Sequence, residues 1–155
     1  MNANWDDSHL SFMRAARDEA QFAAAEDEIP VGAVVVLGGK IIARGHNCSI
    51  MEHDPAGHAE IVALRAAGAY EHNYRLVDAT IYVTLEPCAM CVGAMIQARI
   101  RRLVFGAYDK KSGAAGSVLD LTCERNLNHR FEVNGGLMEE ECAAELKKFF
   151  ENRRG

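Results

Sequence analysis

Two short segments of this sequence place metal-binding side chains close to a carboxylic acid. The first is His58-Ala59-Glu60, and the second is a Pro-Cys-x-x-Cys motif that contains Cys88 and Cys91. One imidazole and two thiolates are typical zinc ligands, and a catalytic zinc keeps a fourth position for water beside three protein ligands. The residue types therefore predict a zinc site formed by His58, Cys88 and Cys91. Glu60 would then be the acid–base group beside it.

Both segments are expected at the start of a helix, which decides whether their side chains can meet. Residues two apart on a helix body point about 200° away from each other, so His58 and Glu60 share a pocket only in a first turn. Cys88 and Cys91 lie on one face of a first turn, where the positive end of the helix favours thiolates. Both helices follow loops at one end of a predicted sheet, where α/β proteins place their sites.

The order of the expected elements predicts an α/β fold. A hairpin with the turn Gly38-Gly39 comes first, and strands then alternate with helices. This order is typical of a three-layer α/β/α sandwich with a mixed central sheet. Ser8 is expected to cap the first helix. The apolar pattern predicts helices over 8–26, 58–68, 88–98 and 139–152, and strands over 31–37, 40–45, 79–85, 102–105 and 130–133.

The composition is that of a single globular domain over residues 1–155. Hydrophobic residues make up 49% and charged residues 25%, which excludes a disordered or collagenous chain. The longest apolar runs, such as 31–37, are far shorter than the roughly 20 residues that span a bilayer, so we expect no membrane contact. No basic flank precedes an apolar N-terminal stretch, so we expect no signal peptide. The five cysteines are an odd number, which argues against full disulfide pairing and predicts a protein of the reducing cytoplasm.

The net charge of −5 and the pI near 5.7 argue against a general nucleic-acid coat protein. Basic residues nevertheless gather over 97–111 and 147–154, where a local surface can meet phosphates. The alternative is a solvated surface of mixed charge, which the charge pattern alone favours.

Each motif alone has another interpretation. A Cys-x-x-Cys pair at a helix start can be a thioredoxin-like redox pair, and a zinc site is purely structural if a fourth ligand closes it. Candidates for that ligand are Cys48, Cys123, His46 and His129. A redox pair would not explain why His58 and Glu60 stand at the start of a second helix. A structural zinc site with four protein ligands would not explain the presence of Glu60.

The two motifs together resemble the signature of the zinc-dependent nucleoside and nucleobase deaminases, which is His-x-Glu followed by Pro-Cys-x-x-Cys. A similarity to the bacterial tRNA-specific adenosine deaminases extends to residues 30–34, 45–47, 73–76, 105–117 and 128–130. It runs from about residue 8 to residue 153, and the stretches 73–76 and 105–117 point to the tRNA enzymes within the superfamily.

The resemblance implies a cytidine deaminase-like fold and the hydrolytic deamination of adenosine to inosine at the wobble position of a tRNA anticodon stem-loop. It implies one Zn²⁺ per subunit, held by His58, Cys88 and Cys91, which lowers the pKa of a water. Glu60 would pass the proton of that water to N1 of adenine, and a further proton to the departing amino group. It also implies a cytoplasmic homodimer.

The resemblance further implies substrate contacts by Asn47, Ala59, Pro87, Asp109, Lys111, Phe149, Phe150 and Arg153. Asn47 would contact the nucleoside, while the N–H of Ala59 and the carbonyl of Pro87 would orient the base. Asp109 and Lys111, in one loop, would approach the flanking ribose and phosphate. Phe149, Phe150 and Arg153, in the final helix, would contact the stem-loop. Some of these residues have an alternative interpretation. Asn47 can be a turn residue, and Asp109 and Lys111 can belong to a solvated loop. At least one of Phe149 and Phe150 can be part of the core.

Two other functions stay open. A free nucleobase or nucleoside deaminase, acting on cytosine, guanine or cytidine, would use the same zinc site and Glu60 without RNA contacts. A zinc-stabilised RNA-binding module would use the basic residues without catalysis. For the homodimer, Met90, Met95 and Ile96 beside the motif helix are interface candidates, with buried core as the alternative.

Overall fold

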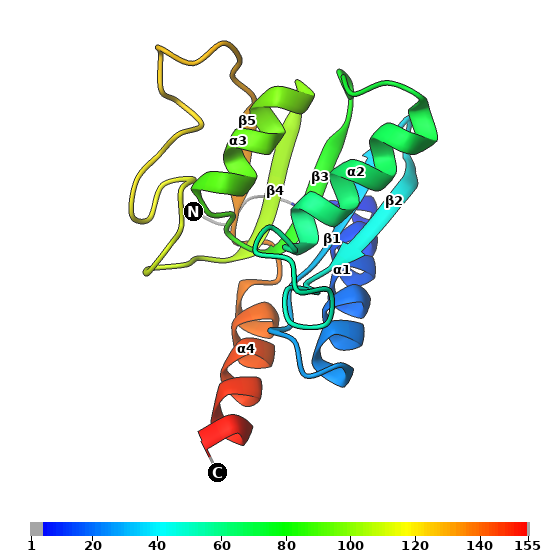
Figure 1. Ribbon diagram of the computed structural model, residues 1–155. Coiled ribbons are helices and arrows are strands. Elements are labelled where there is room, and N and C mark those ends of the chain that lie inside the picture. The colour runs from blue at the N-terminus through cyan, green and yellow to red at the C-terminus, as the bar shows by residue number, and fades with distance from the viewer. Residues whose placement is uncertain (1–4, 155) are drawn as a thin grey trace.

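The computed structural model describes residues 5–154, which form a mixed five-stranded sheet in the order β2-β1-β3-β4-β5, with helices on both faces (Figure 1). The strands are β1 (Gly32–Leu37), β2 (Lys40–His46), β3 (Thr80–Leu85), β4 (Arg102–Ala107) and β5 (Glu132–Gly135). The helices are α1 (Asp7–Ala25), α2 (Ala59–Glu71), α3 (Ala89–Ala98) and α4 (Glu139–Arg154).

The sheet is antiparallel on one side and parallel on the other. Strand β1 pairs antiparallel with both β2 and β3, whereas β4 pairs parallel with both β3 and β5. Parallel strands point their carboxyl ends the same way, so the chain leaves β3 and β4 at one end of the sheet. The predicted α/β class and mixed sheet are confirmed.

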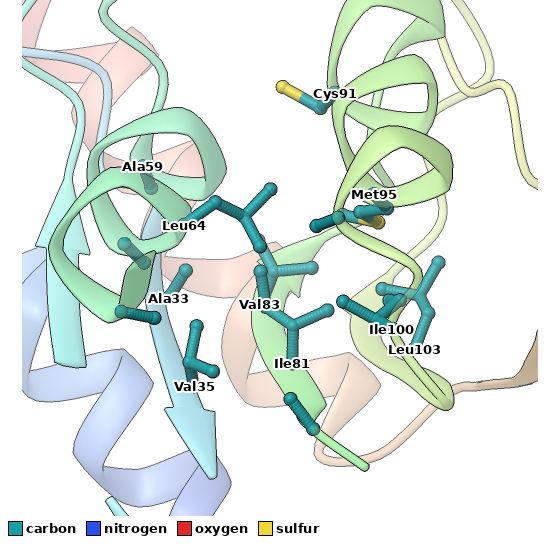
Figure 2. Packing of buried hydrophobic residues seen from close by; sticks show 14 of the residues in the cluster. Ala33, Val35, Ala59, Leu64, Ile81, Val83, Cys91, Met95, Ile100 and Leu103 are labelled. Atoms are coloured by element: carbon teal, nitrogen blue, oxygen red, sulfur yellow. The ribbon is translucent and has the colours of Figure 1, made fainter. Parts of the chain in front are cut away.

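Two apolar layers lie on opposite faces of the sheet, because side chains alternate along each strand. Val35, Ile81 and Leu103 belong to one cluster with residues of α2 and α3, part of which is drawn in Figure 2. Val34 and Val104 belong to the other, with residues of α1 and α4. Helices α2 and α3 thus cover one face and α1 and α4 the other, which confirms the three-layer sandwich (Figure 1).

The predicted elements are present, but some of their ends differ. Asp6, and not Ser8, caps α1: its side chain accepts the His9 N–H at 3.0 Å, while the Ser8 hydroxyl donates to it. Helix α2 runs beyond the predicted end at Gly68, because the left-handed residue that terminates it is His72, with a φ of 53°. A glycine inside a helix costs stability without ending the helix.

Strand β2 lies so close to α2 that position 45 has no room for a side chain. A Cβ on Gly45 would be 2.6 Å from the carbonyl oxygen of Ala59 and 2.7 Å from the nitrogen of Ala63. We expect Gly45→Ala to lower the free energy of unfolding by about 1–3 kcal/mol, because backbone atoms of α2 must move. Urea unfolding of the zinc-loaded chain measures the difference.

Gly93→Ala is the matched control for this substitution. A Cβ on Gly93 in α3 would meet nothing within 4 Å, so alanine should leave stability unchanged or raise it by up to about 1 kcal/mol. Equal unfolding free energies for Gly45→Ala and the unmodified chain would contradict the close packing of β2 on α2.

Candidate active site and metal centre

Three potential metal ligands meet at the starts of two helices. His58 is the N-cap of α2, Cys88 is the N-cap of α3, and Cys91 lies in the first turn of α3. The sulfur atoms of Cys88 and Cys91 lie 3.6 and 3.5 Å from Nδ1 of His58. The prediction that both motifs begin helices is therefore confirmed, and the folded chain brings the three side chains together.

The separations of the donor atoms fit a tetrahedral zinc ion. Zn–S bonds of about 2.3 Å and Zn–N bonds of about 2.0–2.1 Å place nitrogen and sulfur ligands about 3.5 Å apart. Within residues 5–154, His58, Cys88 and Cys91 are the one group of three or more His, Cys, Asp or Glu residues placed to hold a metal ion, with ligand atoms all within 4.8 Å of one another. Three protein ligands match a catalytic rather than a closed zinc site.

The residues considered as a fourth, closing ligand do not join this group. The ring of His46 binds the carboxylates of Glu19 in α1 and of Glu26, the C-cap of α1. The ring of His129 binds the carbonyl oxygen of Ile100 at 2.7 Å. Cys123 is exposed, and neither it nor Cys48 belongs to the metal-binding group found among the described residues. The arrangement therefore favours an open coordination site.

The electrostatics of the group favour a thiolate at its first cysteine. Hydrogen bonds from the Cys91 thiol and from His58 lower the pKa of Cys88 to about 3. The same bond to the Cys88 sulfur, together with burial, raises the pKa of Cys91. The hydrogen bond to Cys88 also raises the pKa of His58. A metal ion must displace the remaining protons, so metal affinity should fall as the pH falls.

Glu60 lies in the first turn of α2 and lines the same cavity as His58 and Cys88, with a volume of about 230 Å³. The residue is 4% exposed, and burial raises the pKa of its carboxyl group to about 7. A carboxyl group with a pKa near neutrality can both accept and donate a proton. The cavity therefore combines a metal-binding group with a proton carrier.

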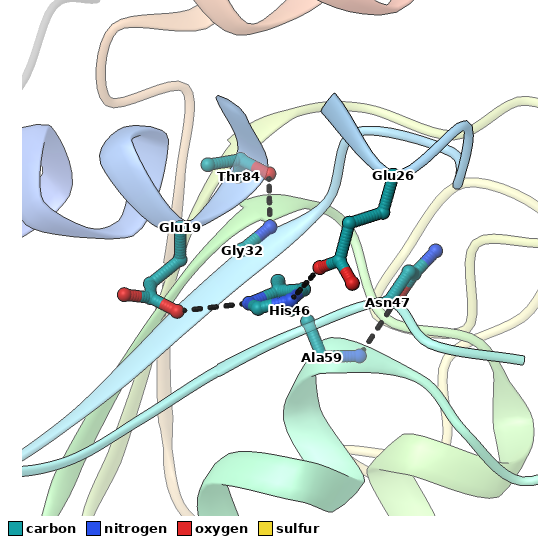
Figure 3. A network of polar contacts seen from close by, with 7 residues as sticks. All are labelled: Glu19, Glu26, Gly32, His46, Asn47, Ala59 and Thr84. Atoms are coloured by element: carbon teal, nitrogen blue, oxygen red, sulfur yellow. Dashed lines mark hydrogen bonds and ion pairs between the residues drawn. The ribbon is translucent and has the colours of Figure 1, made fainter. Parts of the chain in front are cut away.

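Asn47 follows β2 and also lines this cavity. Its side-chain oxygen accepts the backbone N–H of Ala59 at 2.9 Å (Figure 3). That N–H, expected to orient the base, is thus already bonded within the protein. The carbonyl of Pro87 accepts the N–H of Ala114 at 2.8 Å, and its second lone pair leaves it able to accept from a ligand.

Glu86 is a buried acid whose role the sequence did not reveal. The residue is 2% exposed, and its carboxylate accepts the backbone N–H groups of Asp109, Ala115 and Ser117 at 3.0–3.1 Å. Gly113 leaves room for it, because a Cβ there would lie 2.4 Å from Cδ of Glu86. The carboxylate therefore ties the loop after β4 to the start of α3. An acid directly before Pro-Cys, at the end of an apolar strand, is the signal that could have identified it.

Of the other candidates for substrate contact, only Asp109 is among the residues that line this cavity. Lys111 and Phe150 line a separate hollow of about 340 Å³ against α4. Phe149 and Arg153 line a hollow of about 430 Å³ between α1 and α4, where the guanidinium carbon of Arg153 lies 4.9 Å from the centre of the Phe149 ring. Phe150 is exposed and Phe149 is partly buried, so the two rings are not equivalent.

The three candidates for a dimer interface also differ in exposure. Met95 and Ile96 are buried in the core, whereas Met90 is 38% exposed on α3. The first two therefore stabilise the fold, and Met90 is left as a surface candidate.

Comparisons with known proteins relate this chain to deaminases. The chain matches the model of the MafB19-like deaminases over residues 7–154. It is 50% identical over 143 residues to the tRNA-specific adenosine deaminase of Haemophilus influenzae, covering 92% of this chain and 83% of the relative. It is 43% identical to the enzyme of that name from Bacillus subtilis, with coverages of 92% and 89%.

Solved structures extend this similarity to three dimensions. One, from a study of A-to-I editing by tRNA:A34 deaminases at the wobble position of transfer RNA, matches with a TM-score of 0.85 and 44% identity over 87% of this chain and 98% of the other. A guanine deaminase from Bacillus subtilis matches with a TM-score of 0.64 and 35% identity over 76% and 71%. The identities and coverages show that this chain belongs to the family of the tRNA-specific adenosine deaminases.

Proposed function

We propose that this chain hydrolyses adenosine to inosine, with release of ammonia, at the wobble position of a tRNA anticodon. The observation that carries the proposal is the position of Glu60 in one cavity with His58 and Cys88. The relatives named tRNA-specific adenosine deaminase and the structural neighbour described by wobble editing support the choice of substrate.

His58, Cys88 and Cys91 would hold one Zn²⁺, because their donor atoms have the number, chemistry and separations that this ion prefers. When bound, zinc supplies a Lewis acid that makes a water molecule available as hydroxide near pH 7.

Glu60 moves the protons of the reaction. Its carboxylate takes a proton from the attacking water and delivers it to N1 of adenine, while the oxygen bonds to C6. It then takes the remaining proton of the new hydroxyl group and delivers it to the amino group. The C6–N bond breaks and ammonia leaves. Asn47 keeps the N–H groups of its amide for the nucleoside, because its oxygen is bonded to Ala59.

The substrate must be a base splayed out of its stack. Glu60 is 4% exposed within its cavity, and no atom of a stacked base pair can reach a side chain in such a position. Unpaired bases in RNA loops are accessible in this way. Lys111 and Arg153 each line a hollow separate from the cavity, and we propose that there they contact the backbone of the stem-loop.

We expect Lys111→Gln and Arg153→Gln each to weaken binding of an anticodon stem-loop and to reduce its salt dependence. The slope of log Kd against log salt concentration should fall by about 1 for each lost phosphate contact. Fluorescence anisotropy at several salt concentrations measures the slope. Lys40→Gln, at an exposed position in the β1–β2 hairpin, is the control, and an equal loss of slope there would contradict the assignment.

A comparison of substrates tests the proposed function itself. The zinc-loaded chain should release ammonia from the stem-loop faster than from free adenosine, cytosine, guanine or cytidine. Faster turnover of a free base or nucleoside would show the alternative deaminase. Tight binding of the stem-loop without release of ammonia would show an RNA-binding module instead.

We also propose that residues 1–155 form one domain that pairs with a second copy in the cytoplasm, where tRNA is found. An apolar groove of about 800 Å³ between α2 and α3, lined in part by Ile61, Leu64 and Ala94, supports this pairing, because a two-fold interface uses the same face of both copies. Sedimentation equilibrium should give twice the chain mass of 17.0 kDa, and a monomer would contradict the pairing. Within the described residues, no helix is both long and apolar enough to cross a membrane.

A further inference from the structure

His46, the last residue of β2, lies between two glutamates of the neighbouring helix (Figure 3). Its Nδ1 is 3.0 Å from a carboxylate oxygen of Glu19, and its Nε2 is 2.9 Å from a carboxylate oxygen of Glu26. Glu19 lies in the body of α1 and Glu26 is the C-cap of that helix. The ring of Phe22, also from α1, lies 6.2 Å from the imidazole, centre to centre. The imidazole therefore holds the end of β2 against the end of α1.

These contacts require a protonated ring. An ionised carboxylate only accepts hydrogen bonds, so both ring nitrogens must donate, and they do so together only in the imidazolium form. Burial lowers the pKa of His46, but the hydrogen bonds to Glu19 and Glu26 outweigh it, and the pKa is raised above 6.5. A cation also suits this place, because the C-terminal end of a helix carries partial negative charge.

The charges that act on this ring come from α1. Glu19 and Glu26 are the groups that shift its pKa through charge, and the residue paired with His46 in β1 is the uncharged Gly32. On the α2 side, β2 makes its close approach through Gly45, against backbone atoms of Ala59. The protonation of His46 is therefore set by the two glutamates.

One backbone step connects this ring to the candidate active site. Asn47 follows His46, and its backbone N–H donates to the carbonyl of Val31 at 3.1 Å. Its side-chain oxygen accepts the N–H of Ala59, which stands between His58 and Glu60 in the sequence. The end of β2 is thus held by α1 through one residue and holds the first turn of α2 through the next.

We propose that His46 is a positioning residue for the deamination, and that its contacts with Glu19 and Glu26 fix the end of β2 so that Asn47 holds the start of α2 in its active geometry. The kinetic part rests on the proposed function, whereas the structural coupling from His46 to Ala59 does not. Loss of the ring proton breaks one of the two contacts and loosens this connection.

The coupling is tested by NMR on the full zinc-loaded chain, by following the His46 ring and the Ala59 amide between pH 5.5 and 9.5. The chemical shift of the Ala59 amide also responds to the titration of Glu60. The diagnostic part of its pH dependence is therefore the step whose midpoint equals that of the His46 ring. Glu26→Gln should move both midpoints to lower pH, because the glutamine amide can donate to the neutral ring. His46→Gln should remove that step from the Ala59 amide. Arg44→Gln, an exposed charge on the same strand, should change neither midpoint.

Kinetics on the stem-loop supply the second measurement. His46→Gln should keep its zinc and lower kcat about 10–100-fold. This is the range typical of residues that orient the groups of a site without contacting the substrate. Wild-type kcat should fall as the pH rises through the pKa of His46, Glu26→Gln should bring that fall to lower pH, and His46→Gln should lack it. Unchanged kcat in His46→Gln, or an Ala59 amide that does not follow His46, would overturn the proposal. If the wild-type chain binds zinc but does not deaminate the stem-loop, the proposed function fails while the NMR titration still decides the coupling.

Discussion

Glu60→Gln should lower the single-turnover rate of deamination by about 10²–10⁴-fold, the range that a positioned acid–base group contributes. Glutamine fills the same volume but cannot carry a proton between water, N1 and the leaving amino group. His58, Cys88 and Cys91 are untouched, so the variant should bind zinc and the stem-loop as the unmodified chain does. Quenched-flow assays of inosine formation, with zinc measured on the same samples, give both quantities.

Glu139→Gln is the control for Glu60→Gln, because Glu139 is an exposed acid in the first turn of α4. It should turn over at the unmodified rate. A Glu60→Gln variant that retains more than about a tenth of the rate would remove Glu60 from the proton steps. Loss of zinc from that variant would instead place the carboxylate among the ligands.

The second large effect is expected from the cysteines. Cys88→Ser and Cys91→Ser should each weaken zinc binding by at least about 100-fold, because a serine hydroxyl replaces a thiolate that binds the metal. Zinc at a concentration 100 times its Kd stabilises the folded chain by about 2.7 kcal/mol. A variant that no longer binds zinc at that concentration loses this stabilisation. Metal content by mass spectrometry and thermal unfolding with and without a chelator measure the two effects.

Cys123→Ser separates this effect from a general effect of removing a thiol. Cys123 is exposed and lies outside the metal-binding group, so its replacement should leave zinc content and melting temperature unchanged. Full zinc content in Cys88→Ser would contradict the ligand assignment, and loss of zinc in Cys123→Ser would restore the closed structural site.

The meeting of the metal-binding residues could be predicted from the sequence because each motif carries its own local geometry. Cys88 and Cys91, three residues apart, can share one face in a first helical turn, and His58 and Glu60 can share a pocket only at a helix start. The alternation of strands and helices then brings both starts to one end of the sheet. These are short-range constraints, and the folded chain agrees with them.

Contacts between distant segments could not be predicted in the same way. The position of Glu86 before Pro-Cys marks it as a candidate, but nothing local names its partner, the loop after β4. Nor does anything local indicate that Glu28, 2% exposed, accepts the N–H groups of Ile50 and Met51. Both are buried acids bonded to backbone N–H groups, and burial depends on the tertiary fold rather than on neighbours in the sequence. The contact of His46 with α1 belongs to the same class.

Which apolar residues lie at the surface was the hardest feature to predict from the sequence. Met90, Met95 and Ile96 look alike as apolar residues of one helix, yet two are buried and one is exposed, because a helix turns a different face to the sheet every few residues. Phe149 and Phe150 separate for the same reason into a partly buried and an exposed ring.

Wobble editing by this chain is tested by sequencing the anticodon loop of a tRNA with a wobble adenosine after treatment with the zinc-loaded chain. Because inosine is read as guanosine, we expect an adenosine-to-guanosine change at the wobble position alone, absent after treatment with Glu60→Gln. A wobble adenosine that is still read as adenosine, although the chain is folded and carries one zinc, would show that this chain is not a wobble adenosine deaminase.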